Sequence, residues 1–128
     1  MQVQVKLNLA AKASVLRVLD SNKDTGIAVA RTIRAIRRDF KLSEASAAGD
    51  RLLAEASSRG PVNAWEVLLN SDDKPQSFDS DDANLRWLRD RLDKGDAAFA
   101  APSALVEIIL DLHDCITDAL ATATKSVN

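Results

Sequence analysis

The chain contains 128 residues, of which 46% are hydrophobic and 28% are charged, a composition typical of one soluble globular domain. Its formal net charge of −2 argues against a dedicated nucleic-acid-binding protein, because such proteins are usually basic overall. The single cysteine, Cys115, cannot form a disulfide within the chain, which favours a reducing compartment. Residues 1–6 lack the features of a signal peptide, and no apolar run approaches the ~20 residues that span a bilayer. We therefore expect a cytoplasmic protein that makes no contact with a membrane.

A strand is expected at the start of the chain, because apolar and polar residues alternate strictly over residues 2–9. Residues 10–20 fit two structures, a short helix or a second and more buried strand, since the apolar residues around Arg17 show no period of two. Residues 21–24 are expected to form a loop. The inward face of the first strand consists of Val3, Val5, Leu7 and Leu9.

The next segment is predicted to be an amphipathic helix over residues 25–41, with Asp24 or Thr25 as its N-cap. At 100° per residue, its apolar and basic side chains fall on opposite faces. The apolar face consists of Val29, Ile33, Ile36 and Phe40. The basic face carries Arg31, Arg34, Arg38 and Lys41, and we assign Arg37 and Leu42 to the same binding surface.

This basic face has a plain interpretation and a functional one. Arginines on the outside of an amphipathic helix are often only a solvated surface. Here Asp39 is the one acidic residue within the run, so few of the cations are neutralised inside the helix. We predict that the face binds an acidic surface of another protein. Nucleic acid is the alternative partner, because these side chains can meet phosphates, but the acidic net charge and the lack of tyrosine disfavour it.

A second helix is predicted from residue 43 to about residue 57, with Ser43 as its N-cap. Gly60 and Pro61 follow it and stop it, because glycine tolerates a left-handed cap and proline cannot continue a helix. Its inward face is expected to contain either Ala47 or Ala48, then Leu52 and Ala56, with Leu53 beside them.

The middle of the chain is predicted to be less regular. Residues 65–69 are expected to form a short strand, and the polar and acidic residues 70–82 a flexible loop. A third helix should follow, capped by Asp79 or Ser80 and ending at Asp93. Its inward face consists of Leu85, Leu88 and Leu92, with Trp87 at the margin.

Residues 97–101 are predicted to form a short closing strand, and a last helix should run from Pro102 or Ser103 to about Ala123. Its apolar residues repeat at spacings of four and three, as in a coiled coil. This seam is either a homodimer interface or a surface that packs on its own domain. The seam consists of Leu105, Ile109, Leu112, Ile116 and Ala119, and an acidic side carries Glu107, Asp111, Asp114 and Asp118.

Residue types that support catalysis or metal binding are few. His113 and Cys115 are two positions apart on a predicted helix, so their side chains diverge and cannot form a nucleophile–base pair. The chain has no phosphate-binding glycine loop, and the aspartates of residues 72–82 do not have the spacing of a calcium-binding loop. We therefore expect a protein without enzymatic activity, cofactor or metal.

The expected element order is strand, helix, helix, short strand, helix, short strand, and then the terminal helix. Residues 26–34, GIAVARTIR, are similar to the first-helix motif of the C-terminal domain of the bacterial ribosomal stalk protein, a lysine followed by VAVIKAVR. Residues 42–45, LSEA, are similar to the LKEA motif at the start of its second helix. Residues 80–95, SDDANLRWLRDRLDKG, resemble its third helix.

The resemblance implies an α+β fold with a small antiparallel sheet packed against helices, which the adaptor subunit of the Clp protease shares. Residues 1–101 are then the compact domain, and residues 102–128 add an amphipathic helix and a short tail. In the stalk family, basic and apolar residues of the first two helices bind translation factors, and Arg31, Arg34 and Leu42 match three of these positions. We accordingly expect a protein-binding adaptor or regulator, of host or phage origin.

Overall fold

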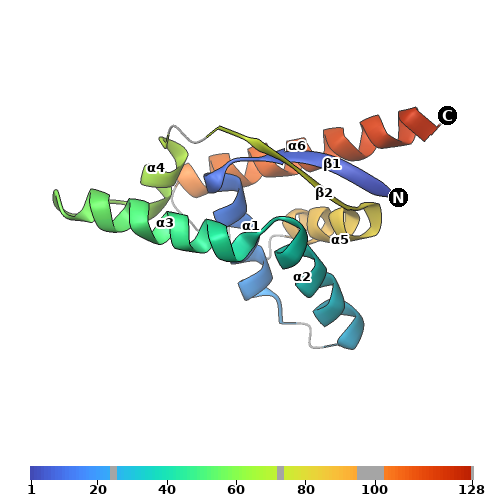
Figure 1. The fold of residues 1–128 in the computed structure, drawn as a ribbon, viewed down its shortest axis with the longest axis horizontal. Helices are drawn as coiled ribbons and strands as arrows, with labels where there is room; N and C mark the ends of the chain where they lie inside the picture. The colour runs from blue at the N-terminus through green and yellow to red at the C-terminus, as the bar shows by residue number, and fades with distance from the viewer. Residues whose placement is uncertain (24–25, 72–73, 95–102, 128) are drawn as a thin grey trace.

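The computed structural model describes residues 1–23, 26–71, 74–94 and 103–127, and it confirms a small α+β fold with helices around one antiparallel sheet (Figure 1). The C-terminal helix is present, as expected. In chain order the elements are β1 (Gln2–Leu7), α1 (Leu9–Ser21), α2 (Ile27–Asp39), α3 (Leu42–Ser57), α4 (Ala64–Leu69), β2 (Gln76–Asp81), α5 (Asp82–Asp93) and α6 (Ser103–Val127).

Strand β1 has the predicted alternation, because every second side chain points into the core. Val3, Val5 and Leu7 are buried, whereas the polar residues between them are exposed. The strand ends two residues earlier than predicted. Asn8 caps helix α1 by accepting a hydrogen bond from the Ala11 N–H at 2.8 Å, so the next residue is already helical.

Strand β2 corrects the prediction of a flexible loop at residues 70–82. It pairs with β1 along its whole length, from Gln76 opposite Leu7 to Asp81 opposite Gln2. Only Phe78 and Ser80 of this strand are buried. Because two inward side chains among acidic neighbours give a weak hydrophobic pattern, the sequence alone did not indicate a strand.

Helices α1 and α4 occupy two segments for which a strand had been considered or predicted. Residues 10–20, for which helix and strand were both open, belong to helix α1. The short strand predicted at residues 65–69 is wrong, because helix α4 occupies this place. Asn63 begins α4 by accepting hydrogen bonds from the N–H groups of Trp65 and Glu66, at 3.0 and 3.2 Å. This cap outweighs the strand preference of tryptophan and valine.

The predicted caps of the other helices are also corrected. Gly26 is the N-cap of α2, and Asp24 and Thr25 lie outside the described residues. Lys41, in a left-handed conformation with φ of 52°, is the N-cap of α3, so Ser43 lies inside the first turn. Asp81, rather than Asp79 or Ser80, is the N-cap of α5.

Buried side chains confirm the inward face of α5 and identify that of α3. Leu85, Leu88 and Leu92 are buried in α5, and Trp87 is half-buried at the margin, as predicted. In α3, Ala48 is half-buried and Ala47 is exposed. Leu52, Leu53 and Ala56 are half-buried as well, and Leu42 and Ala45 are the fully buried residues of this helix.

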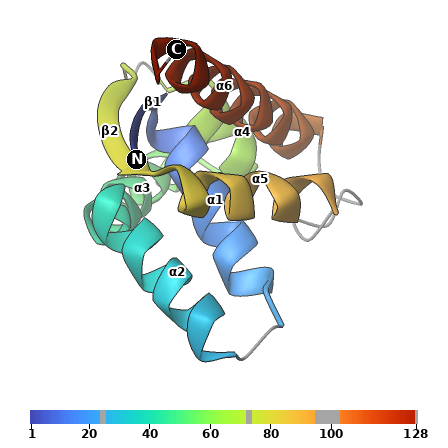
Figure 2. The same cartoon turned by 90° about the vertical axis from the view of Figure 1, so that its right-hand side faces the viewer.

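Helix α6 lies across the molecule on the side opposite α2 and belongs to the main core (Figures 1 and 2). The predicted homodimer seam is therefore covered within its own domain, which is the alternative that the spacing had left open. The closing strand predicted at residues 97–101 lies outside the described residues. The seam residues in the core are Leu105, Ile109, Leu112 and Ile116, and Ala119 packs against them half-buried.

Candidate protein-interaction surface

Helix α2 projects from the body of the protein, and its N-terminal end points away from the other helices (Figures 1 and 2). Its two ends differ sharply in exposure. Ile36 and Phe40, at the C-terminal end, are 0% exposed, whereas Ile27, in the first turn, is 73% exposed. The helix is thus anchored at one end and free at the other.

The anchored end is held by packing and by polar contacts with β2. The rings of Phe40 and Phe78 meet edge to face, with centroids 6.1 Å apart. The hydroxyl of Ser80 donates a hydrogen bond of 2.9 Å to the Asp39 carboxylate, which also accepts from Arg38 Nε at 3.1 Å. These contacts fix the rotation of the helix and place its one acidic residue between Ser80 of β2 and Arg38 of the basic face.

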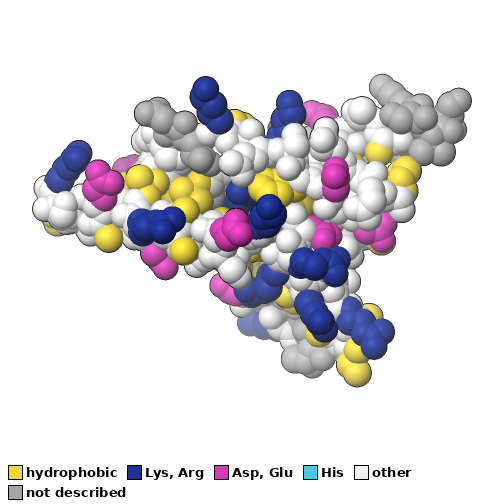
Figure 3. All heavy atoms as spheres, in the orientation of Figure 1, with side chains coloured by type: hydrophobic (Ala, Val, Ile, Leu, Met, Phe, Trp, Pro, Cys, Tyr) yellow, Lys and Arg dark blue, Asp and Glu magenta, His cyan; other side chains and the backbone are white. Residues whose placement is uncertain are grey.

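The predicted basic face is exposed along the whole helix. Figure 3 shows Lys and Arg side chains gathered on the projecting part of the molecule, with hydrophobic surface at its end. All the predicted cations of this face are exposed: Arg31, Arg34, Arg37, Arg38 and Lys41.

Leu42 does not belong to this surface, contrary to the prediction. Its side chain is 0% exposed and lies in the main core, beside Phe40 and Ile36. The left-handed turn at Lys41 changes the direction of the chain between α2 and α3, and the first residue of α3 lies buried. Leu42 was expected to correspond to an apolar contact residue of the stalk family. In this protein its side chain is part of the core instead.

Two of the five cations have acidic partners among the described residues, and one of these pairs is that of Arg38 with Asp39. Arg37 forms an ion pair of 3.0 Å with Asp20 of α1, but both side chains are largely exposed. Exposed pairs of this kind contribute about 0–1 kcal/mol, so a binding partner can replace them at low cost. Within the described residues, Arg31 and Arg34 have no ion-pair partner. Their charge is available to a ligand.

Ile27 is a member of this face that the sequence analysis missed. It lies opposite Ile36 around the helix, so 100° per residue places it among the arginines. The presence of an isoleucine on a face that is otherwise basic could have identified Ile27 from the sequence as an exposed apolar residue. We define the basic face of α2, from here on, as Arg31, Arg34, Arg37, Arg38 and Lys41 together with Ile27.

His113 and Cys115 each form a hydrogen bond with a residue of a different element. His113 Nε2 lies 2.7 Å from an Asp93 carboxylate oxygen, which joins α6 to α5. Cys115 Sγ donates a hydrogen bond of 3.2 Å to the Lys6 carbonyl of β1. Among the described side chains, no group of three or more His, Cys, Asp or Glu residues is arranged to hold a metal ion.

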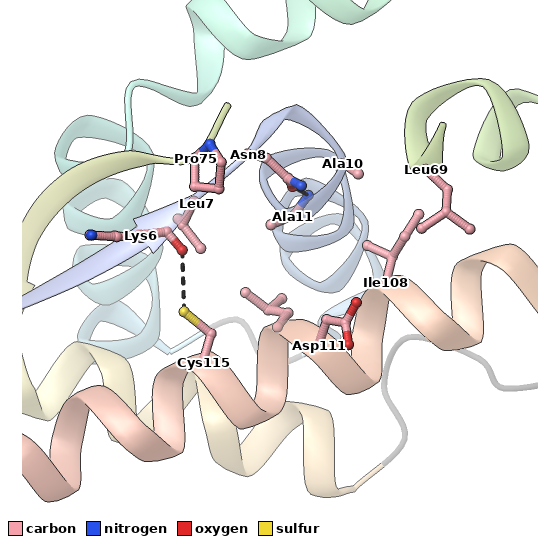
Figure 4. A pocket seen from close by; sticks show the side chains of 11 residues that line it. Lys6, Leu7, Asn8, Ala10, Ala11, Leu69, Pro75, Ile108, Asp111 and Cys115 are labelled. Atoms are coloured by element: carbon pink, nitrogen blue, oxygen red, sulfur yellow. Dashed lines mark hydrogen bonds between the residues drawn. The ribbon is translucent and has the colours of Figure 1, made fainter. Parts of the chain in front are cut away.

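A cavity of about 150 Å³ lies between the end of β1, the start of α1 and the middle of α6 (Figure 4). Its walls are mainly apolar, and its polar lining residues are Lys6, Asn8, Asp111 and Cys115, of which the Cys115 thiol donates a hydrogen bond to the Lys6 carbonyl. Asn8 already uses its side-chain oxygen to cap α1. The two charged residues of the lining, Asp111 and Lys6, extend in different directions, so the cavity does not bring them together for acid–base chemistry (Figure 4).

The N-terminal ammonium forms ion pairs with two neighbouring aspartates. The Met1 ammonium lies 3.0 Å from Asp81 and 3.4 Å from Asp82. The hydrogen bond to Asp81 raises the pKa of this ammonium. Burial opposes ionisation of Asp82, but its hydrogen bonds with Asp81 and with the ammonium outweigh burial and lower its pKa. These contacts tie β1 to the start of α5 and lie apart from the basic face of α2.

In the part of the chain that the structure describes, no helix has the length and apolarity needed to cross a membrane. Comparison of the chain with protein-family models, with curated proteins and with solved structures finds no match.

Proposed function

We propose that this protein is a non-enzymatic adaptor or regulator that binds an acidic surface of another protein through the basic face of α2. One observation carries the proposal: a helix that is anchored at one end projects an exposed isoleucine beside Arg31 and Arg34, which have no ion-pair partner among the described residues. An unused cluster of like charges destabilises a helix slightly, so its presence on the least embedded helix favours a role in recognition.

The composition of the face suits a protein partner. Protein interfaces commonly have an apolar centre within a polar rim, and arginine is among the residues that contribute most to binding. Ile27 can enter an apolar depression while Arg31 and Arg34 meet carboxylates around it. Complementary charge also speeds association, in a manner that weakens as salt is added.

Nucleic acid is the second candidate, because phosphates can meet the exposed cations of this face, among which Arg31 and Arg34 have no ion-pair partner in the described part of the chain. Phosphate contacts use charge alone, whereas a protein partner also uses the exposed isoleucine. Ile27→Ser separates the two, since it removes apolar contact without changing charge. A large loss of binding in this variant favours protein, and an unchanged affinity with a steep salt dependence favours nucleic acid.

The main test is affinity capture from the source cell with the wild type and with a variant carrying Arg31→Glu, Arg34→Glu and Arg38→Glu. The variant should lose a specific partner while its circular dichroism spectrum and melting temperature stay close to those of the wild type, because these side chains are exposed. Capture of the same partner at full yield by this variant would place the binding site on another surface. A matched control with the same change of charge carries Arg51→Glu, Arg59→Glu and Lys74→Glu, three exposed positions outside α2.

A further inference from the structure

The outer face of α6 is acidic and has an exposed apolar residue of its own. Leu110 is 51% exposed on this face, although the opposite face of the same helix lies in the core. None of the described side chains of α6 is a lysine or arginine, and the imidazole of His113 lies beside this face, with its Nδ1 atom 3.7 Å from an Asp114 carboxylate oxygen. The exposed carboxylates belong to Glu107, Asp111, Asp114 and Asp118.

The acidic face of α6 matches the basic face of α2 in spacing and length. The positions 27, 31, 34 and 38 of α2 and the positions 107, 111, 114 and 118 of α6 both repeat at intervals of four, three and four. At 1.5 Å per residue each stripe is about 16 Å long. Each face also has one large exposed apolar side chain, Ile27 in α2 and Leu110 in α6.

We propose that the basic face of α2 binds the acidic face of α6 in a second copy of the same chain. The two helices lie on opposite sides of one molecule in both views, so they cannot pair within it (Figures 1 and 2). Because the two faces lie on opposite sides of the molecule, one pair of copies cannot form both α2–α6 contacts, and the assembly is head to tail rather than two-fold symmetric. This inference rests on the proposed function, because it uses the same face of α2 and names its partner.

Sedimentation of the wild type tests the contact directly. At 0.1 M salt the Debye length is about 10 Å, and the weight-average mass should rise above 13.8 kDa as the concentration is raised to about 1 mM. At 1 M salt the Debye length falls to about 3 Å, and the mass should return to that of one chain. A wild type that sediments as a monomer at about 1 mM in 0.1 M salt overturns the inference.

Charge exchange identifies the surfaces involved. One variant carries Arg31→Glu and Arg34→Glu, and a second carries Asp114→Lys and Asp118→Lys. Each alone places two charges of the wrong sign at the centre of the contact and should associate at least about tenfold more weakly than the wild type. An equimolar mixture of the two should associate again, because each intact face then finds its intact partner on the other variant. The control variant carries Arg51→Glu and Arg59→Glu and should associate as the wild type does.

The outcomes separate this inference from the proposed function. The α2–α6 contact is overturned if both charge-reversed variants associate as strongly as the wild type. It is also overturned if both variants associate weakly and their mixture does not regain association. Capture of a different protein through α2, by a chain that remains monomeric, supports the proposed function and overturns the inference. Restored association in the mixture supports the inference whether or not a different protein is captured.

Discussion

Replacing Ile36 by alanine is expected to lower the free energy of unfolding by about 2–4 kcal/mol. The Ile36 side chain is fully buried in the main core, near Phe40 and Leu42. The substitution removes three carbon atoms, which at ~0.8 kcal/mol each amount to about 2.4 kcal/mol of lost transfer free energy. The cavity that remains adds to this loss to the extent that the neighbouring side chains cannot move into it.

The same helix supplies its own controls. Ile27→Ala removes the same atoms from a side chain that is 73% exposed, so the free energy of unfolding should change by less than about 0.5 kcal/mol. Alanine is also the better helix former by a few tenths of a kcal/mol, which offsets any lost contact. Ile33 is half-buried against the core, and Ile33→Ala should lie between the other two.

Urea unfolding followed by far-ultraviolet circular dichroism measures all three variants, with equal m-values as the sign of a common two-state transition. In a thermal melt, Ile36→Ala should reduce Tm by about 10 °C, since 1 kcal/mol corresponds to about 3–6 °C at this size. Equal losses for Ile27→Ala and Ile36→Ala, or a larger loss at Ile27, would show that α2 packs through a different face. The basic face would then be misplaced as well.

Three further predictions concern polar and conformational features. Ser80→Ala leaves the half-buried Asp39 carboxylate without its 2.9 Å hydrogen bond and should cost about 1–3 kcal/mol in urea unfolding, whereas no loss would mean that water replaces the bond fully. Lys41→Gly should raise stability by up to about 1 kcal/mol, because φ is 52° at this position, and a lower Tm would contradict strain there. Asp81→Asn should lower the raised pKa of the Met1 ammonium, as measured by NMR titration. Because that pKa is higher in the folded state, the stabilisation is complete below pH 8.0 and is lost as pH rises through the folded value, so the variant and the wild type should converge in stability at high pH.

Repeated patterns within one element determined the parts of the fold that could be predicted from the sequence. Alternation over β1 correctly places Val3 and Val5 in the core, and the helical period correctly places Ile36 and Phe40 opposite the arginines. These predictions hold because a strand or helix turns its side chains at a constant angle, whatever packs against it. The exposed cations of the candidate site follow from the same periodicity.

Only the tertiary structure decided which surface covers each apolar face. Residues 76–81 form a strand because β1 is available to pair with them, far away in the sequence. The seam of α6 has the spacing of a coiled coil, but its own domain fills it. Leu42 was assigned to the binding surface but lies in the core, because the turn at Lys41 starts α3 with this residue inward. The spacing of apolar residues within one strand or helix predicts which face a side chain lies on. Contacts between segments that are distant in the sequence determine whether that face is buried.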